Sequence, residues 1–329
     1  MPITLTYSPA YTLVPTYECF NRCSYCNFRR DPGTDPWLTL TEAETRLRAL
    51  QGSGVVEILI LSGEVHPQSP RRAAWGQHLY DLADLALRLG FLPHTNAGPL
   101  SRAEMAQLQT VNVSMGLMLE QLTPALLATV HRHAPSKLPE LRLQQLHQAG
   151  ELGIPFTTGL LLGIGETVAD WEASLGAIAT CQQRWGHIQE VILQPHSPGT
   201  QQAEWGQALA GDRLLAATHL ARQCLPPEVA IQIPPNLVAK PEQLQACVAA
   251  GARDLGGLSP KDEVNPDYPH PTPVRLAHTL APDYELVPRL PVYPQYISRL
   301  PERLQRAIAS RSTGASSSQQ LIHTNAETQ

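Results

Sequence analysis

The segment Cys19-Phe-Asn-Arg-Cys23-Ser-Tyr-Cys26 places three thiols within eight residues of a 329-residue chain. Its gaps of three and then two residues let one short loop wrap around a single inorganic centre. Thiolates are the ligands that suit iron, and a cubane 4Fe-4S cluster has one more iron than this loop has cysteines. Three cysteines leave one iron open to a small-molecule chelate. We therefore predict that Cys19, Cys23 and Cys26 hold a 4Fe-4S cluster.

Two other interpretations of this loop stay open from the residues alone. A structural zinc site normally has about four protein ligands in closed tetrahedral coordination, and the next candidate along the chain is His66. A disulfide would use two of the thiols and leave the third one over. The remaining cysteines, Cys181, Cys224 and Cys247, lie among apolar residues in helical patterns, which is typical of small buried hydrophobic side chains.

Outward from this loop, strand and helix patterns alternate along the chain. An extended segment over residues 11–15 leads into the loop, and an almost continuous apolar run over 55–61 predicts a strand buried on both sides. Six strand and helix units are clear as far as residue 193, and two weaker ones over 212–255 would complete eight. Further strands are expected at 91–95, 111–117, 155–162, 188–193, 229–233 and 253–255. This alternation predicts a parallel (β/α) TIM-type barrel, which carries its chemistry at the carboxyl ends of the strands.

Helix starts are marked by three sequences of the capping-box type, Thr41-x-x-Glu44, Ser101-x-x-Glu104 and Thr167-x-x-Asp170. A longer helical region is expected over residues 123–149. After residue 257 the composition changes, because ten prolines fall between Pro260 and Pro301. We predict a barrel over 1–257, a proline-rich extension over 258–310 that packs on the barrel and could cross its mouth, and a disordered tail over 311–329.

The bulk composition favours a small-molecule enzyme. Hydrophobic residues make up 43% of the chain and charged residues 16%, with a net charge of -5, which argues against a nucleic-acid-binding surface. The first residues show no basic segment followed by an apolar one, and no apolar run approaches about 18 residues. We therefore expect a cytoplasmic protein with no membrane partner.

Two glycine-containing turns follow predicted strands. Ser62-Gly63-Glu64 comes directly after the second strand, where backbone carbonyls and a carboxylate could accept hydrogen bonds from an ammonium group. Gly163-Ile-Gly165-Glu166 follows the fifth strand, where Glu166 could hold the loop by accepting amide hydrogens. Either turn can equally be an ordinary connection between a strand and a helix. The remaining candidates for cofactor contact are Tyr25 in the cysteine loop and two polar residues near strand ends, Asn96 and Ser114.

The cysteine spacing, the aromatic Tyr25 and the two turns resemble the radical S-adenosylmethionine (SAM) superfamily. Within it the chain resembles the first subunit type of 7,8-didemethyl-8-hydroxy-5-deazariboflavin synthase over about residues 5–300. Two segments differ from the pattern expected for that family, at residues 63–67 and 194–198, both on loops expected to face the substrate. The resemblance rests on the segments Thr6-Tyr-Ser8, Pro93-His-Thr-Asn96, Ser114 to Glu120, Ile164-Gly-Glu-Thr167, Ile231 to Leu237, Asp254 to Pro260 and Val264-Asn-Pro266.

This resemblance implies an activity, cofactors and partners. The three cysteines match the cluster ligands, and the turns at 62–64 and 159–166 match regions that contact SAM. An electron from a donor such as ferredoxin or flavodoxin would split SAM into methionine and a 5'-deoxyadenosyl radical. That radical would act on an adduct of tyrosine and 5-amino-6-ribitylaminouracil supplied by a second synthase subunit, and ring closure with loss of ammonia would make the enzyme a carbon-nitrogen lyase. The alternatives are the partner type of synthase, which joins tyrosine to the uracil, and a non-catalytic metal-binding protein.

Overall fold

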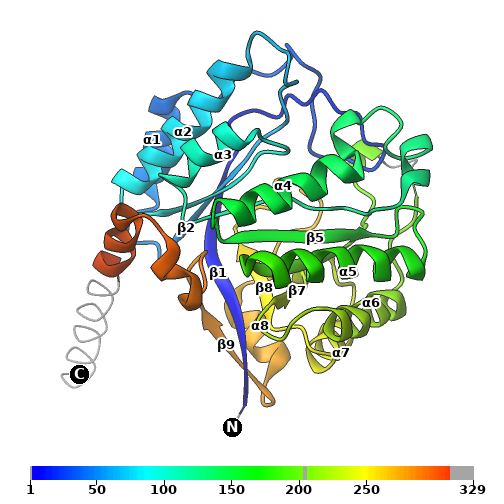
Figure 1. Ribbon diagram of the computed structural model, residues 1–329. Coiled ribbons are helices and arrows are strands. Elements are labelled where there is room, and N and C mark those ends of the chain that lie inside the picture. The colour runs from blue at the N-terminus through cyan, green and yellow to red at the C-terminus, as the bar shows by residue number, and fades with distance from the viewer. Residues whose placement is uncertain (1, 203–205, 312–329) are drawn as a thin grey trace, which may run out of the picture.

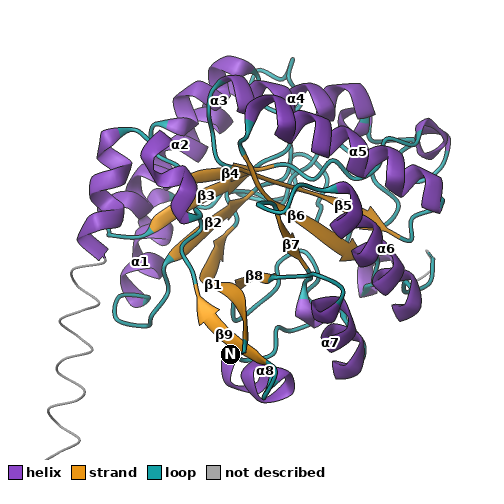
Figure 2. Ribbon diagram, turned by 60° about the horizontal axis from the view of Figure 1, so that its bottom comes forward, coloured by secondary structure: helices purple, strands orange, loops and turns teal. Residues whose placement is uncertain are grey.

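Strands and helices alternate along the chain and close into a barrel with the helices outside (Figure 1; Figure 2). The computed structural model describes residues 2–202 and 206–311. The barrel strands of this part of the chain are β1 (Ile3–Leu13), β2 (Glu57–Leu61), β3 (Leu92–Asn96), β4 (Ser114–Gly116), β5 (Phe156–Leu162), β6 (Ile188–Pro195), β7 (Ala230–Gln232) and β8 (Asp254–Leu258). The helices between them are α1 (Leu40–Ala49), α2 (Arg72–Arg88), α3 (Arg102–Gln109), α4 (Pro139–Glu151), α5 (Val168–Trp185), α6 (Gly211–Cys224) and α7 (Pro241–Ala249).

The long first strand closes the barrel. The strands from β2 to β8 pair in sequence order, and β1 pairs in parallel with both β8 and β2. Every pairing in the sheet is parallel, as expected when helices form the crossovers. The predicted (β/α) barrel is therefore confirmed, and the two weaker units complete it.

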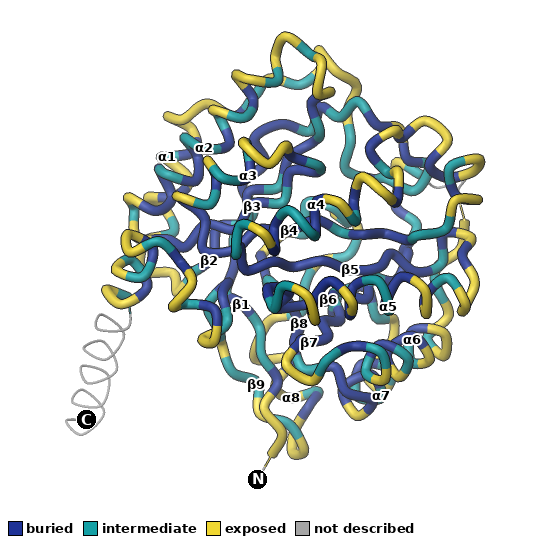
Figure 3. Tube along the Cα trace, viewed as in Figure 1, coloured by how far each residue is buried: buried dark blue, intermediate teal, exposed yellow. Residues whose placement is uncertain are grey.

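The two faces of the strands differ in what covers them. On β2, Ile58 and Ile60 point toward the helices and are fully buried, while Leu59 and Leu61 alternate with them and stay partly accessible. The same alternation separates buried Val191 from partly accessible inward residues on β6. Figure 3 shows the strands as the buried centre beneath helices whose outer faces are exposed. The barrel interior is thus a chamber and is not filled by layers of branched side chains.

Helix starts follow the predicted caps with one correction. Ser101 and Thr167 each accept a hydrogen bond in a complete capping box. The first helix begins earlier than predicted, because Thr39 forms the box with Glu42 in place of Thr41 with Glu44. Both threonines are followed three residues later by a glutamate, so the sequence pattern fits two registers.

The helical region expected over residues 123–149 is interrupted. It consists of two short 3-10 helices, η1 (Pro124–Ala128) and η2 (Pro135–Lys137), followed by α4. Each piece begins with a proline at its first position, and a proline cannot continue a preceding helix because it has no N–H to donate. This break brings η2 and α4 to the mouth of the barrel.

The proline-rich extension contains more regular structure than predicted. It forms α8 (Pro273–Leu280), the strand β9 (Tyr284–Pro288), a 3-10 helix η5 (Pro294–Arg299) and a final helix over 302–311. β9 pairs in parallel with the first half of β1. Of the predicted tail, residues 312–329 lie outside the described residues. The boundaries predicted for barrel and extension stay a prediction.

The extension reaches both ends of the barrel. Near the mouth, Glu263 accepts a hydrogen bond from the Tyr17 hydroxyl at 2.7 Å. The segment over residues 289–300 instead crosses the amino end, where the Pro291 carbonyl accepts a hydrogen bond from Ser114 at 2.7 Å and Tyr296 donates one to the Ile188 carbonyl at 3.0 Å. The expectation that the extension crosses the mouth is therefore wrong for this segment, which closes the opposite end. Within the described residues, no helix combines the length and the apolar character that a bilayer crossing requires.

Candidate functional site

The cysteine loop follows β1 at the mouth of the barrel and is anchored from several directions. The backbone N–H of Phe20 donates to the Glu64 carbonyl at 3.1 Å, and that of Ser24 donates to the Val130 carbonyl at 3.0 Å. All three cysteines of the loop are unpaired by disulfides and line a single cavity of about 350 Å³. The strand end and these anchors hold the three thiols around one opening of the barrel.

The three thiols are suited to hold a cluster. A cubane cluster takes each thiolate on a different iron, so its ligands need not converge on one point. Burial raises the pKa of Cys23 to about 12, so this thiol needs a metal partner to be held as a thiolate. The donor set of Cys19, Cys23 and Cys26 therefore suits a 4Fe-4S cluster with one open iron.

The turn after β2 approaches the cysteine loop so closely that it requires a glycine. A Cβ added to Gly63 would lie 2.2 Å from the carbonyl oxygen of Glu18. The backbone N–H of Gly63 donates to the Thr16 carbonyl at 2.8 Å. The neighbouring Ser62 hydroxyl accepts a hydrogen bond from the Trp75 indole at 3.0 Å and donates to the Gly63 carbonyl. The glycine thus brings the turn against the loop, while Ser62 stabilises the turn itself.

Glu64 carries the carboxylate of this turn into the cavity. Its Oε2 accepts a hydrogen bond from Asn21 in the cysteine loop at 2.9 Å, and its Oε1 lies 3.4 Å from the Arg142 guanidinium. The turn predicted to accept an ammonium group is therefore placed beside the thiols with its carboxylate oriented. A Cβ on Gly98 would lie 2.3 Å from the Glu64 side chain, so this second glycine also makes room for it.

A pair of buried cations lies on the same side of the cavity. Lys137 Nζ lies 2.5 Å from Glu120 Oε1, and the Arg142 guanidinium lies 3.8 Å from the same carboxylate. Burial raises the pKa of Glu120, but the charges of Lys137 and Arg142 outweigh it and hold that pKa below its ordinary value. Glu120 also has φ 66°, a conformation that non-glycine residues rarely adopt and that clusters at functional sites.

Both signs of charge therefore line one part of the cavity. The carboxylates of Glu64 and Glu120 could accept hydrogen bonds from an ammonium group, and Lys137 and Arg142 could donate to a carboxylate. An amino acid carries both groups on one carbon. This arrangement suits the methionine end of a SAM molecule chelated at an open iron.

The wall next to the thiols is aromatic and apolar. Tyr25 packs against the apolar cluster of Leu126, Val130, Leu161 and Ile164, and its hydroxyl lies 2.9 Å from His131 Nε2. An apolar wall with an aromatic ring suits the flat base of a nucleoside.

The glycine turn after β5 supports this wall from behind. Glu166 accepts hydrogen bonds from the Gly163 N–H at 2.6 Å and the Ile164 N–H at 2.8 Å, as the sequence predicted. The Trp171 indole donates to the same carboxylate at 2.9 Å. Gly163 and Gly165 have φ of 92° and 114°, which only glycine adopts freely. This turn therefore shapes the loop that carries the wall.

The structure brings together most of the predicted cofactor residues, though not all of them. Those that line the cavity with the three cysteines are Tyr25, Ser62, Gly63, Glu64 and Asn96. Gly163, Gly165 and Glu166 lie behind its wall and do not line it. Their roles stay predictions.

Ser114 lies at the opposite end of the barrel from the cysteine loop. Its strand was expected from residue 111 but begins only at Ser114, which puts this residue at the amino end of the barrel. There its hydroxyl donates to the Pro291 carbonyl at 2.7 Å and contacts His94 Nδ1 at 2.7 Å. The expectation that Ser114 meets the ribose or the methionine carboxylate is therefore wrong.

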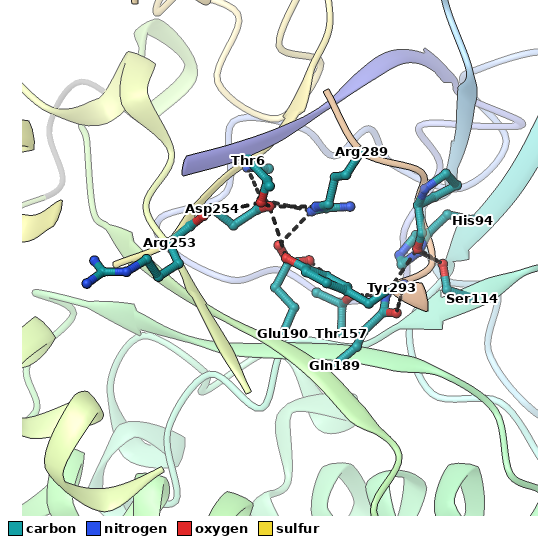
Figure 4. A network of polar contacts seen from close by, with 12 residues as sticks. Thr6, His94, Ser114, Thr157, Gln189, Glu190, Arg253, Asp254, Arg289 and Tyr293 are labelled. Carbon is teal, nitrogen blue, oxygen red and sulfur yellow. Dashed lines mark hydrogen bonds and ion pairs between the residues drawn. The ribbon is translucent and has the colours of Figure 1, made fainter. Parts of the chain in front are cut away.

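The cavity continues down the barrel to a network of buried charges (Figure 4). Arg289, from the segment after β9, donates to both oxygens of Asp254 at 2.5 and 2.8 Å and to Glu190 at 2.7 Å. The hydroxyl of Tyr293 also donates to Asp254, at 2.9 Å. The Arg289 charge outweighs burial and holds the pKa of Asp254 below its usual range, whereas burial keeps the pKa of Glu190 well above its usual range.

Several of these residues were not singled out from the sequence. Lys137 and Arg142 stand in a region that was expected to be one continuous helix, and Arg289 stands in the proline-rich extension. Glu120 ends the segment Ser114 to Glu120, in which no pattern assigns a role to its carboxylate. The sequence signal available for these residues was a charged side chain beside an apolar run. Such a pattern is common on any helix surface and does not identify a binding residue.

The comparisons with known proteins agree with this geometry. Residues 13–178 match the model of the radical SAM superfamily. A protein of Synechococcus elongatus named 7,8-didemethyl-8-hydroxy-5-deazariboflavin synthase is 67% identical over 307 residues, which cover 93% of this chain and 91% of the relative. A protein of the same name from Nostoc sp. is 65% identical over 304 residues, covering 92% and 90%.

Solved structures show the same fold at much lower identity. The FeFe-hydrogenase maturase HydG from Carboxydothermus hydrogenoformans superposes with a TM-score of 0.71 over 92% of this chain and 76% of the maturase, at 16% identity. At that identity the likeness establishes the barrel fold alone.

Proposed function

We propose, from the premise that this chain belongs to the 7,8-didemethyl-8-hydroxy-5-deazariboflavin synthase family of the radical SAM superfamily, that it forms the deazaflavin ring from a tyrosine and 5-amino-6-ribitylaminouracil adduct with loss of ammonia. The reaction would make it a carbon-nitrogen lyase. The chain is a radical SAM enzyme of deazaflavin biosynthesis with a 4Fe-4S cluster and SAM as cofactors. The substrate and the loss of ammonia are the proposed part.

One observation carries this proposal: the cavity at the thiols is continuous with the chamber inside the barrel. Cluster and SAM, when bound, supply the one-electron cleavage that yields methionine and a 5'-deoxyadenosyl radical. Cys19, Cys23 and Cys26 would hold the cluster. Glu64 and Glu120 would orient the SAM ammonium group, Lys137 and Arg142 its carboxylate, and Tyr25 would cover the adenine. The substrate would lie deeper in the chamber, where the protein excludes water.

We also propose partners and a location for the reaction. A second synthase subunit would supply the adduct, and a one-electron donor such as ferredoxin or flavodoxin would reduce the cluster. The reaction would take place in the cytoplasm, where thiols are kept reduced. We retain, as part of this proposal, the division into a barrel over 1–257 and an extension over 258–310.

The test is anaerobic turnover of the reconstituted protein with SAM, dithionite and the purified adduct. We expect deazaflavin fluorescence together with 5'-deoxyadenosine and ammonia, and none of these products from Cys23→Ser. Formation of the adduct from tyrosine and 5-amino-6-ribitylaminouracil would instead assign the partner type of synthase. Zinc without sulfide in the reconstituted protein, and no cleavage of SAM even with adduct present, would refute enzymatic function.

A further inference from the structure

The chamber ends in a polar floor that the residues around the cluster do not use. This floor consists of Glu57, His94, Thr157, Glu190 and Arg289, which we call the floor residues. They come from β2, β3, β5, β6 and the segment after β9, and all of them line the cavity. Glu57 begins β2 and Ser62 follows its end, so five residues at about 3.3 Å each separate the floor from the turn beside the cluster by about 16 Å along the strand. A group on the floor is therefore separate from the methionine end of SAM.

His94 presents a hydrogen-bond acceptor to this space. Ser114 donates its hydroxyl proton to the Pro291 carbonyl, so it accepts from His94 Nδ1 and fixes the neutral tautomer with a bare Nε2. This Nε2 would lie 2.9 Å from a Cβ on Gly116, and the His94 side chain lines the cavity while being only 8% exposed. An acceptor on the cavity wall can take a hydrogen bond from a ligand that carries a donor.

The floor contains two buried carboxyl groups and a hydroxyl group. Burial raises the pKa of Glu57, and the opposing charge of Arg289 does not reverse this. Burial likewise raises the pKa of Glu190. The opposing charge of Arg289 does not reverse this rise, since Arg289 also pairs with Asp254. A protonated carboxyl group offers an O–H donor as well as a carbonyl acceptor. The Thr157 hydroxyl, 3.3 Å from Glu190, has the same dual capacity.

The level above the floor has the opposite character. Leu59 and Ile192 face the cavity there, each two residues further along its strand than Glu57 or Glu190. Gly116 and Gly257 lie lower, beside His94 and Glu57, and leave space because they have no side chains. Apolar walls with open space between them suit a flat ring. The chamber therefore offers an apolar slot over a floor of mixed donors and acceptors.

We propose that the floor residues bind the hydroxylated chain of the substrate, while its flat heterocycle occupies the slot between Leu59 and Ile192. This inference rests on the proposed function, whose substrate carries a five-carbon polyol on a pyrimidine. Each hydroxyl of such a chain donates one hydrogen bond and accepts others, which matches groups that do both. The polyol would anchor the substrate so that its other end points up toward the cluster.

The test compares two substrates on the reconstituted holoenzyme: the adduct itself and an adduct with a methylamino group in place of the ribitylamino group. We expect the wild-type KM to be about tenfold or more higher for the truncated adduct, because the floor would be left unpaired. Glu57→Leu should bring the two KM values within about threefold of each other, and Glu57→Gln should preserve the preference, because an amide also donates and accepts. The matched control Glu44→Leu, on α1 outside the barrel with 42% of its side chain exposed, should leave the preference unchanged.

Equal KM values for the two adducts in the wild type would overturn the proposal, and so would an unchanged preference in Glu57→Leu. Iron content and melting temperature identify a variant that fails to fold, in which case Thr157→Val takes its place with the same expected result. If neither adduct yields deazaflavin, the proposed function fails separately. Equilibrium binding of the two adducts, followed by tryptophan fluorescence, then decides the floor proposal by the same ratio.

Discussion

Replacing Arg289 by methionine should destabilise the folded barrel by about 3–5 kcal/mol, because it leaves buried acids without their cation. The guanidinium contacts both oxygens of Asp254, a residue with no exposed surface, and one oxygen of Glu190. The Arg289 side chain is only 11% exposed, so water cannot replace it easily. For a chain of this size the loss corresponds to a fall in melting temperature on the order of 10 °C.

The sign of the pH dependence follows from the same contacts. Arg289 holds the folded-state pKa of Asp254 below its unfolded value of 3.8, so this carboxylate stabilises the wild type above that pH and loses its contribution as the pH falls further. Without Arg289, burial dominates and raises the pKa of Asp254, so the variant is stabilised by protonation. The stability difference between wild type and variant should therefore be largest at neutral pH and shrink toward pH 4.

The assay is thermal unfolding of the reconstituted proteins under anaerobic conditions at pH 7.5 and pH 5. Arg303→Met is the matched control, because Arg303 pairs with Asp84 at the surface with 46% of its side chain exposed, where a pair contributes about 0–1 kcal/mol. Adding Asp254→Asn to Arg289→Met should recover at least half of the loss, since no unpaired carboxylate then remains on Asp254. A loss below about 1 kcal/mol for Arg289→Met, or an equal loss at both pH values, would refute the reasoning.

Three further outcomes are expected. Cys23→Ser should lose nearly all bound iron and sulfide after reconstitution, whereas the control Cys181→Ser, at a buried cysteine outside the loop, should keep them. Metal and sulfide analysis measures both, and equal iron and sulfide contents in the two variants would exclude Cys23 as a ligand. Lys137→Met should weaken SAM binding about tenfold or more in equilibrium dialysis, with the exposed Lys240→Met as the unchanged control. Burial lowers the pKa of His94 to about 3, so below pH 6.5 the unfolded state binds a proton at this residue and the folded state does not. The melting temperature of His94→Asn should therefore fall less steeply between pH 6.5 and 5 than that of the wild type. Parallel slopes for the two proteins would contradict this.

The barrel itself could be predicted because each unit carries local signals. A buried apolar run such as residues 55–61 identifies a strand without reference to the rest of the chain. A capping sequence such as Ser101 to Glu104 identifies the start of a helix in the same way. The cysteine spacing, likewise, is contained within one loop. Parallel strands joined by helices then leave few arrangements other than a barrel or an open sheet.

The residues that the sequence did not reveal act across long distances. Lys137 and Arg142 meet Glu120 and Glu64 only because prolines break the expected helix before α4 and turn it toward the mouth. Arg289 reaches Asp254 only because β9 pairs with the first half of β1. No pattern within either segment specifies such a partner.

Ser114 shows how an error of a few residues changes a functional assignment. A strand that starts three residues later than expected moves its polar residues by about 10 Å along the barrel axis, from one end toward the other. Strand ends are the least certain part of a sequence-based prediction, and in a barrel they decide which residues meet a ligand.

The plug formed by residues 289–300 follows every barrel strand along the chain, so a ribosome makes it after the barrel wall. A barrel without this segment would lack the cover of Pro291 and Arg289 at its amino end, and small molecules would then have a second route to the interior. Once Pro291 meets Ser114 and Arg289 meets Asp254, the amino end is shut. From then on the mouth beside the cysteines is the route that remains along the barrel axis. The cluster, SAM and the substrate would all enter there, so the group that binds deepest has to enter before the groups that bind nearer the mouth.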